Sequence, residues 1–119
     1  MTDINYYRQG KEFFFSPDKI LFYEASGGIT YAHTRDHIYR VKHRLYELES
    51  TLPTNFLRIS KSAIVNTNHI LSLMTTVGTT GTVEFSSTHK RLHISRQYIK
   101  VLRSALRHRS LNYDKTYQI

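Results

Sequence analysis

The sequence predicts a mainly β domain with two helices. Nine tyrosines and six phenylalanines, many of them in short runs, favour strands over helices. The spacing of the apolar residues changes from a strand pattern to a helical pattern in only two places. At 119 residues the chain is expected to be a single domain with a hydrophobic core of its own.

The first third of the chain predicts four antiparallel strands in a meander. Residues 1–10 are polar and are expected to be flexible. Three turn signals follow, at Ser16-Pro17-Asp18, Ser26-Gly27-Gly28 and Arg35-Asp36. The strands expected between them cover residues 11–15, 19–25, 29–34 and 37–41. We expect Phe13, Phe14 and Phe15 to pack in the core.

A first helix is predicted after this meander. Its apolar residues recur at spacings of four, three and four, which is one face of a helix; they are Val41, Leu45, Leu48 and Leu52. Pro53 ends it. We expect this helix to cover the core and assign no chemistry to it.

The centre of the chain holds a small cationic sequence, Ser60-Lys61-Ser62, between two short β-rich segments. Asn66 and Asn68 tolerate turn geometry and predict a turn after the second segment. One interpretation is a hairpin with a polar connection. The other is a loop that contacts DNA, because two hydroxyls around one ammonium suit phosphates and Lys61 is long enough to reach a guanine edge.

The remainder predicts three strands and a second helix. The strands are expected at residues 70–75, 82–85 and 91–94, with a flexible loop over 77–81 and a polar turn over 86–90. Ser95 is a candidate N-cap for a helix from Arg96 to about His108. The apolar face of this helix contains Tyr98, Ile99, Leu102, Ala105 and Leu106. Residues 110–119 are expected to form a flexible tail.

A narrow cationic stripe lies opposite that apolar face. Its members are Arg96, Lys100, Arg103 and Arg107. Arg103 and Arg107 are interpreted as a solvated helix face. Arg96 differs, because it lies in the first turn, beside the backbone N–H groups that bind anions.

The overall charge points to a polyanionic partner. The net charge is +8 and the isoelectric point is about 9.9, which suits DNA, RNA or an anionic membrane surface. The chain has no cysteine, no apolar stretch near 18 residues and no signal peptide pattern. Its seven histidines form no zinc-binding pattern, and no catalytic or nucleotide-binding motif is present. We therefore expect no catalytic residue, metal or cofactor.

The central sequence resembles the signature of the LytTR family of bacterial DNA-binding domains. The matching pattern is Phe56-x-Arg58-x-Ser60-Lys61-Ser62-x-x-Val65-Asn66-x-x-x-Ile70. Further matches lie at residues 22–25, 45–49, 83–85 and 94–96, and the resemblance covers residues 11–106. It places the domain at residues 11–109. Ser60 stands where many members carry histidine, so a contact by that imidazole is not carried over.

The resemblance implies an elongated stack of small β-sheets with two short-to-medium helices, whose loops enter successive major grooves. It also implies a cytoplasmic transcription regulator that binds promoter direct repeats, with two protomers per operator site. Residues 31–34 and 44–49 look most like stand-alone members, which lack a receiver domain and are often encoded beside a small membrane protein that restrains them. That membrane protein is a further expected partner. A piece cut from a longer response regulator is the alternative.

Three groups of DNA-contacting residues follow from the resemblance and the chemistry. The early contact loop is Gly28, Ile29 and Thr30, and the central loop is Ser60, Lys61 and Ser62, with Lys61 reading a base. The third group is Ser95, Arg96 and Lys100, in which Arg96 is expected to recognise guanine through two hydrogen bonds. Lys90 and Arg91 are expected phosphate contacts, and Arg58 is as compatible with a structural role as with DNA contact.

Two other functions remain open from the sequence. A small basic RNA-binding β-barrel would place several exposed Tyr and Phe side chains on one strand surface to stack on bases. A purely structural interaction module would show no salt-dependent binding of nucleic acid. The sequence does not specify the operator, the regulated genes, the inducing signal or whether transcription is activated or repressed.

Overall fold

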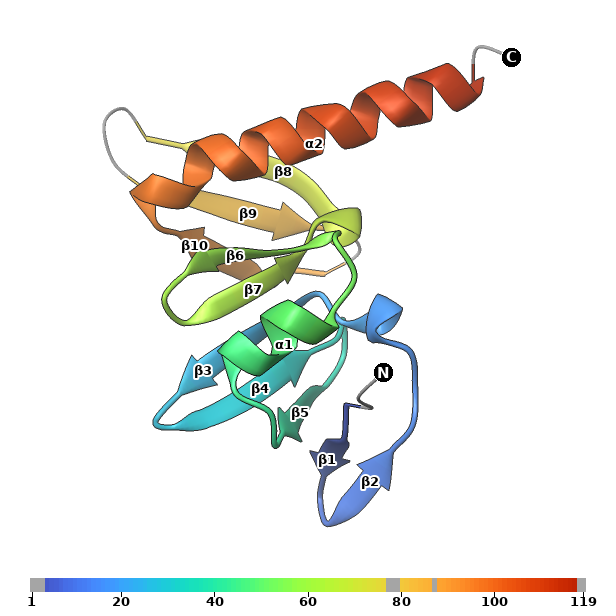
Figure 1. Cartoon of the computed structure of the whole chain (residues 1–119), viewed down its shortest axis with the longest axis vertical. Coiled ribbons are helices and arrows are strands. Elements are labelled where there is room, and N and C mark those ends of the chain that lie inside the picture. Colours follow the sequence, from blue (N-terminus) through green and yellow to red (C-terminus); the bar gives the residue numbers. More distant parts are fainter. Residues whose placement is uncertain (1–3, 77–79, 87, 118–119) are drawn as a thin grey trace.

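Two antiparallel sheets and two α-helices make up the computed structural model of the chain, which describes residues 4–76, 80–86 and 88–117 (Figure 1). The expected loop at 77–81 and turn at 86–90 lie partly outside these residues. The elements in chain order are β1 (Tyr6–Arg8), β2 (Lys11–Phe13), the 3-10 helix η1 (Pro17–Lys19), β3 (Phe22–Ser26), β4 (Ile29–His33), β5 (Ile38–Val41), α1 (Leu45–Thr51), β6 (Phe56–Ser60), β7 (Ala63–Asn66), the 3-10 helix η2 (Thr67–His69), β8 (Ile70–Thr75), β9 (Gly81–Phe85), β10 (Arg91–Ile94) and α2 (Arg96–Tyr117).

The larger sheet has seven strands in the order β2-β1-β5-β4-β3-β7-β6, and the smaller has the order β10-β9-β8. The hairpin β6-β7 forms as the sequence predicts, and β3 pairs with β7 to join it to the meander. Only three of the four predicted meander strands follow one another in the sheet, as β3-β4-β5. The first predicted strand is the edge strand β2, which pairs with β1, and the second begins at Phe22 because Pro17–Lys19 forms η1. The mainly β fold class with two helices is confirmed. The helices were expected to be short to medium in length, but α2 has 22 residues.

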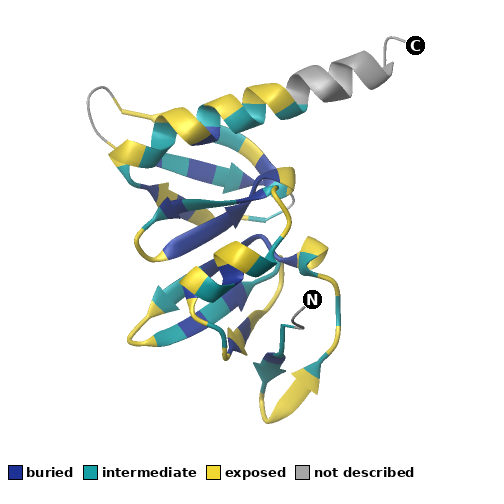
Figure 2. Ribbon diagram, in the orientation of Figure 1, coloured by how far each residue is buried: buried dark blue, intermediate teal, exposed yellow. Residues whose placement is uncertain are grey.

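Two hydrophobic clusters lie on opposite faces of the larger sheet (Figure 2). Adjacent residues of β3 point to opposite faces, so that Phe22 packs in one cluster and Tyr23 in the other. The first cluster holds residues of β9, β10 and α2, including Leu102, and the second holds Leu45 and Leu48 of α1. The apolar faces predicted for both helices therefore pack against these clusters, with Leu45, Leu48 and Leu102 buried and the other members of the faces mostly half-buried.

Three further local features differ from the expectations. Residues 6–8, which were expected to be flexible, form β1, because Tyr6 is 1% exposed and its hydroxyl hydrogen-bonds that of Tyr23 at 2.7 Å. Phe14 is 84% exposed instead of packed in the core, while Phe13 and Phe15 are half-buried against Tyr39. Helix α2 continues to Tyr117, through most of the expected tail.

Candidate nucleic-acid interface

The three predicted contact regions lie along one edge of the molecule (Figure 1). The β3–β4 turn, the β6–β7 turn and the start of α2 are stacked on the left of this view, along the long axis. They come from separate parts of the sequence and meet only because β3 pairs with β7 and the second sheet packs on the first. The fold thus presents a row of loops on one side.

Main-chain hydrogen bonds connect these three regions directly. The amide of Ala25, at the end of β3, donates to the carbonyl of Ser62 in the β6–β7 turn at 2.8 Å. The amide of Ser95, just before α2, donates to the carbonyl of Ile59 in β6 at 3.0 Å. The β6–β7 hairpin is therefore tied to both of its neighbours, and the relative positions of the loops are set by the backbone.

The central loop is organised from beneath by Arg58. Its guanidinium donates to the carbonyl of Ser60 at 2.7 Å and to that of Lys61 at 2.6 Å, and it forms an ion pair with Glu49. The amide of Ser62 donates to the hydroxyl oxygen of Ser60 at 3.1 Å, which closes the turn. All the recorded polar contacts of Arg58 are internal, so the structure favours the structural role and leaves the exposed Lys61 for a ligand.

A hollow of about 310 Å³ lies between the central loop and β10. Residues from two predicted groups meet in it, namely Ser60 and Ser62 from the loop, and Arg91 and Ser95 from the end of the second sheet. His93 also lines it and was missed by the sequence analysis. The sequence contains a pattern that indicates this position, because the inward positions of Leu92 and Ile94 place His93 on the outer face of the strand.

The first turns of α2 present free cations. Arg96 and Lys100 are exposed, and no hydrogen bond or ion pair is recorded for either within the described residues. The expected N-cap residue Ser95 precedes the helix, and its carbonyl accepts a hydrogen bond from the amide of Tyr98 at 2.9 Å. Arg103 is half-buried and lies 3.5 Å from the hydroxyl of Thr75, as suits a residue without a DNA contact.

The early contact loop is a tight glycine turn. Gly27 and Gly28 have φ angles of 58° and 79°, which side chains other than glycine rarely adopt. Gly28 is exposed and Ile29 is half-buried. Thr30 is only 6% exposed, so the backbone of the turn and Ile29 form its outer surface.

The two expected phosphate contacts differ in availability. The ammonium of Lys90 donates to the carbonyl of Thr34 at 2.8 Å and lies 3.4 Å from Nδ1 of His33. Burial lowers the pKa of Lys90, although the carboxylate of Asp36 opposes this. These contacts hold Lys90 against β4 and argue against a phosphate contact. Arg91 pairs with Glu84 at 3.0 Å, but its side chain remains 58% exposed.

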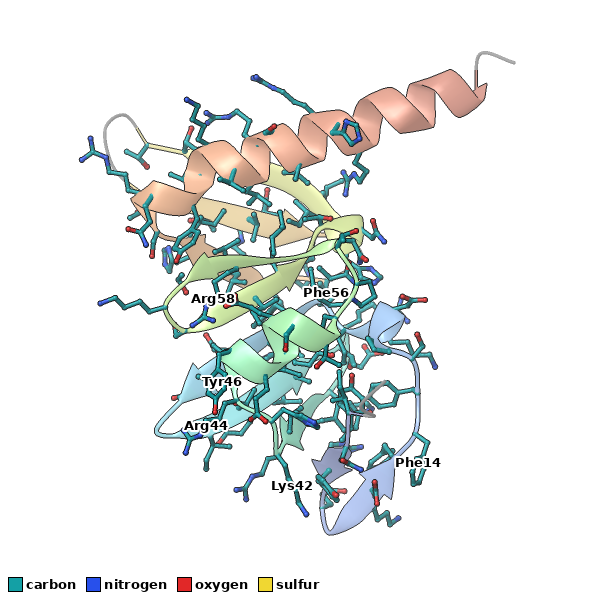
Figure 3. The ribbon with its side chains drawn as sticks, in the orientation of Figure 1. Phe14, Lys42, Arg44, Tyr46, Phe56 and Arg58 are labelled. Atoms are coloured by element: carbon teal, nitrogen blue, oxygen red, sulfur yellow. The ribbon has the colours of Figure 1, made fainter. Side chains whose placement is uncertain are left out.

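Among the residues whose side chains the structure describes, the aromatic residues form no stacking surface of the kind that the RNA-binding alternative requires. Six of them are buried: Tyr6, Phe22, Tyr23, Tyr39, Phe56 and Phe85. Phe14 and Tyr46 are exposed, and they lie apart, one after β2 and one in α1 (Figure 3).

Metal-binding and membrane-spanning features were also sought in the described part of the chain. It contains no group of three or more His, Cys, Asp or Glu residues that could hold a metal ion. None of its helices is long and apolar enough to cross a membrane.

Comparison with known proteins identifies the family. The model of the LytTr DNA-binding domain matches residues 10–107. A solved structure described as the LytTr DNA-binding domain of a response regulator from Bacillus cereus superposes with a TM-score of 0.79 at 24% identity, covering 89% of this chain and 98% of that one. This likeness shows the shared fold of two sheets and two helices.

Relatives in Staphylococcus aureus are described as uncharacterized HTH-type transcriptional regulators. One from the bovine strain RF122 / ET3-1 is 37% identical over 89 residues, which are 75% of this chain and 59% of the relative. Another, from strain MRSA252, is 46% identical over 57 residues, or 48% of this chain and 38% of the relative. The matched residues thus span 59% of the first relative's length and 38% of the second's.

The helix-turn-helix motif named in the descriptions of these relatives does not describe the fold of this chain. In that motif a short turn joins two helices and the second reads the groove. In this chain five strands, β6 to β10, separate α1 from α2. The extended match to the family model decides the assignment. The chain belongs to the LytTr DNA-binding domain family.

Proposed function

We propose that the domain reads specific duplex sequences in promoters by placing the three stacked loops in successive major grooves. The observation that carries this proposal is the row of loops along one edge, tied together by the hydrogen bonds of Ala25 and Ser95. A loop row fixed by the backbone can follow the groove without the ordering cost that flexible loops would incur on binding.

The side chains along this edge supply both kinds of DNA contact. Lys61, Arg96 and Lys100 are exposed cations that the described residues leave free. Phosphate contacts by such cations give affinity, and hydrogen bonds to base edges give specificity. We assign guanine recognition to Arg96, because its planar fork matches the O6 and N7 acceptors, and we assign a phosphate contact to Lys100 one turn later.

The proposed assembly is two protomers on direct repeats, placed head to tail. Such an arrangement needs no two-fold interface between free protomers. The proposal includes a cytoplasmic location and a small membrane protein that restrains the regulator, both of which rest on the resemblance to stand-alone family members.

The decisive experiment compares Arg96→Ala with Lys100→Ala, which remove equal charges from the same helix face. Wild type and both variants are titrated with a site selected from random duplexes, the same site with the candidate guanine changed, and random duplex. Loss of the guanine contact should cost about 1–3 kcal/mol on the selected site and much less on random DNA. Loss of the phosphate contact should weaken all three complexes alike and lower the salt slope by about one.

A third variant, Arg96→Lys, keeps the charge and should still lose discrimination, because an ammonium lacks the planar fork. Equal weakening of all three duplexes by Arg96→Ala would make Arg96 a phosphate clamp. If wild-type affinity hardly changed between low and physiological salt, the DNA-binding proposal itself would fail.

A further inference from the structure

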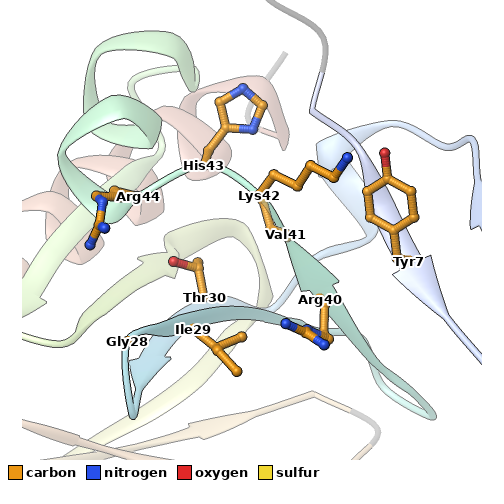
Figure 4. Close-up of a pocket in the computed structure, with 9 residues that line it drawn as sticks. All are labelled: Tyr7, Gly28, Ile29, Thr30, Arg40, Val41, Lys42, His43 and Arg44. Carbon is orange, nitrogen blue, oxygen red and sulfur yellow. The ribbon is translucent and has the colours of Figure 1, made fainter.

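A cationic hollow of about 420 Å³ lies beside the early contact loop and was not among the predicted sites (Figure 4). It is formed where the β3–β4 turn faces the connection between β5 and α1. The residues that line it are Tyr7, Gly28, Ile29, Thr30, Arg40, Val41, Lys42, His43 and Arg44. Three of these nine residues carry permanent positive charges, and none is acidic.

The three cations reach this hollow for different structural reasons. Arg40 lies in β5 between the buried Tyr39 and Val41, so strand alternation directs it to the outer face. Lys42 and Arg44 follow in the extended connection to α1, and both are exposed. Figure 4 shows Lys42 and Arg44 extending from this connection above the strand that carries Arg40.

The cations of the hollow have no ion-pair partner within the described residues. No ion pair is recorded for Arg40, Lys42 or Arg44 among the described residues, although other arginines pair with Asp36, Glu49 and Glu84. The nearby carboxylate of Glu47 accepts a hydrogen bond from the amide of Arg44 at 2.9 Å. The ammonium of Lys42 lies 5.0 Å from the ring centroid of Tyr7, which leaves its charge in place.

Three like charges around one hollow repel one another unless an anion lies between them. Phosphate is an anion that suits guanidinium and ammonium donors lining one hollow. We propose that this hollow is a phosphate-binding subsite that holds a backbone phosphate of bound duplex, next to the groove entered by the β3–β4 turn. This inference rests on the proposed function, because Gly28, Ile29 and Thr30 belong both to the contact loop and to the hollow.

The location fits a backbone contact. The side chain of Arg44 projects at the same edge of the molecule as Arg58, beneath the central loop (Figure 3). A phosphate held there would anchor the end of the loop row that lies farthest from α2. Phosphate contacts set the register of a protein on DNA, so this anchor would fix how far the β3–β4 turn enters its groove.

The test compares two double variants that remove equal charge. Lys42→Gln with Arg44→Gln removes two cations from the hollow, and Lys11→Gln with Lys19→Gln removes two exposed lysines from β2 and η1. If each contact contributes a salt slope of 0.9 and vanishes at 1 M salt, one contact is worth about fivefold in affinity at 0.15 M, and two about thirtyfold. We expect that loss, with a slope lower by about two, only for the first pair.

A folding control and a phosphate titration accompany the DNA titrations. Thermal unfolding followed by circular dichroism checks that both double variants remain folded. If wild type binds duplex and the two pairs weaken it equally, the subsite is overturned while the DNA-binding proposal stands. If wild type shows no salt-dependent binding, the proposed function fails first. Inorganic phosphate, titrated by NMR, should shift the amides of residues 40–44 in wild type; such shifts with no selective loss of DNA affinity would reassign the hollow to a free phosphorylated ligand.

Discussion

Acidification should destabilise this domain through His33, whose ring is held uncharged at the contact between the two sheets. The ring stacks on Phe22 with centroids 4.2 Å apart, and its side chain is 13% exposed. Burial and the neighbouring ammonium of Lys90 lower its pKa from 6.5 to about 4. Glu24 lies 3.5 Å from Nε2 and favours the protonated ring, but that carboxylate is 40% exposed and is screened by water.

The pH dependence of the free energy of unfolding follows from the difference in proton binding between the unfolded and the folded chain. Between pH 6.5 and pH 4 the unfolded chain binds a proton at this residue and the folded chain does not, so stability falls as the pH is lowered. The contribution is fully present above pH 6.5 and is lost towards pH 4. Between pH 7 and pH 5 this residue should lower the free energy of unfolding by about 2 kcal/mol.

The measurement is urea unfolding at pH 7 and pH 5 for wild type, His33→Gln and His89→Gln. Glutamine does not titrate, so His33→Gln should lose about 2 kcal/mol less than wild type over this interval. His89→Gln is the matched control, because it makes the same substitution at an exposed position. Equal pH dependence in all three proteins, or a His33 pKa at or above 6.5 by NMR titration, would refute the reasoning.

Three further predictions concern the interface and its support. Asn66→Ala should cost about 2–4 kcal/mol in urea unfolding, because the buried amide donates to the carbonyl of Ile20 at 3.0 Å and accepts from Asn55 and from the amide of Asn68. Arg58→Gln should speed hydrogen exchange at the amide of Ser62 and weaken binding to the selected site, because it removes the hydrogen bonds to two loop carbonyls. Glu49→Gln removes only the ion pair and should have a smaller effect on both measurements. Equal effects of the two variants would contradict the role of Arg58 in organising the loop. Inserting about 5 bp between half-sites should abolish tight binding in a mobility-shift assay and about 10 bp should restore it, while unchanged affinity would indicate independent protomers.

Much of the fold could be predicted because its signals are local. The spacing of Leu45, Leu48 and Leu52 indicates a helix face, and the alternation around Leu92 and Ile94 indicates an inward strand face. The central hairpin could also be predicted, since polar turn residues separate two β-rich segments. The capping side chain of Asn66, which accepts from the amide of Asn68 at 3.0 Å, follows from the turn preference of asparagine.

The features that were missed depend on contacts between distant parts of the chain. Strand β1 forms because Tyr6 reaches Tyr23 and pairs with Val41, and neither partner is apparent from the polar sequence around it. The sequence around Lys90 suggests a surface lysine, yet its ammonium donates to the carbonyl of Thr34, which follows β4. The cationic hollow likewise requires the β3–β4 turn to face residues 40–44, which becomes evident only once β4 and β5 are paired.

Under the proposed function, the way the loops are held would allow one scaffold to carry different DNA specificities. The bonds that join the three regions run from the amides of Ala25 and Ser95 to the carbonyls of Ser62 and Ile59, and all four groups belong to the main chain. Any residue other than proline can supply them. Lys61 and Arg96 take no part in this framework, so their replacement should change base recognition without moving the loops. Arg58 is the exception, because its side chain binds two loop carbonyls, and we therefore expect this position to tolerate substitution least among the polar residues of the central loop.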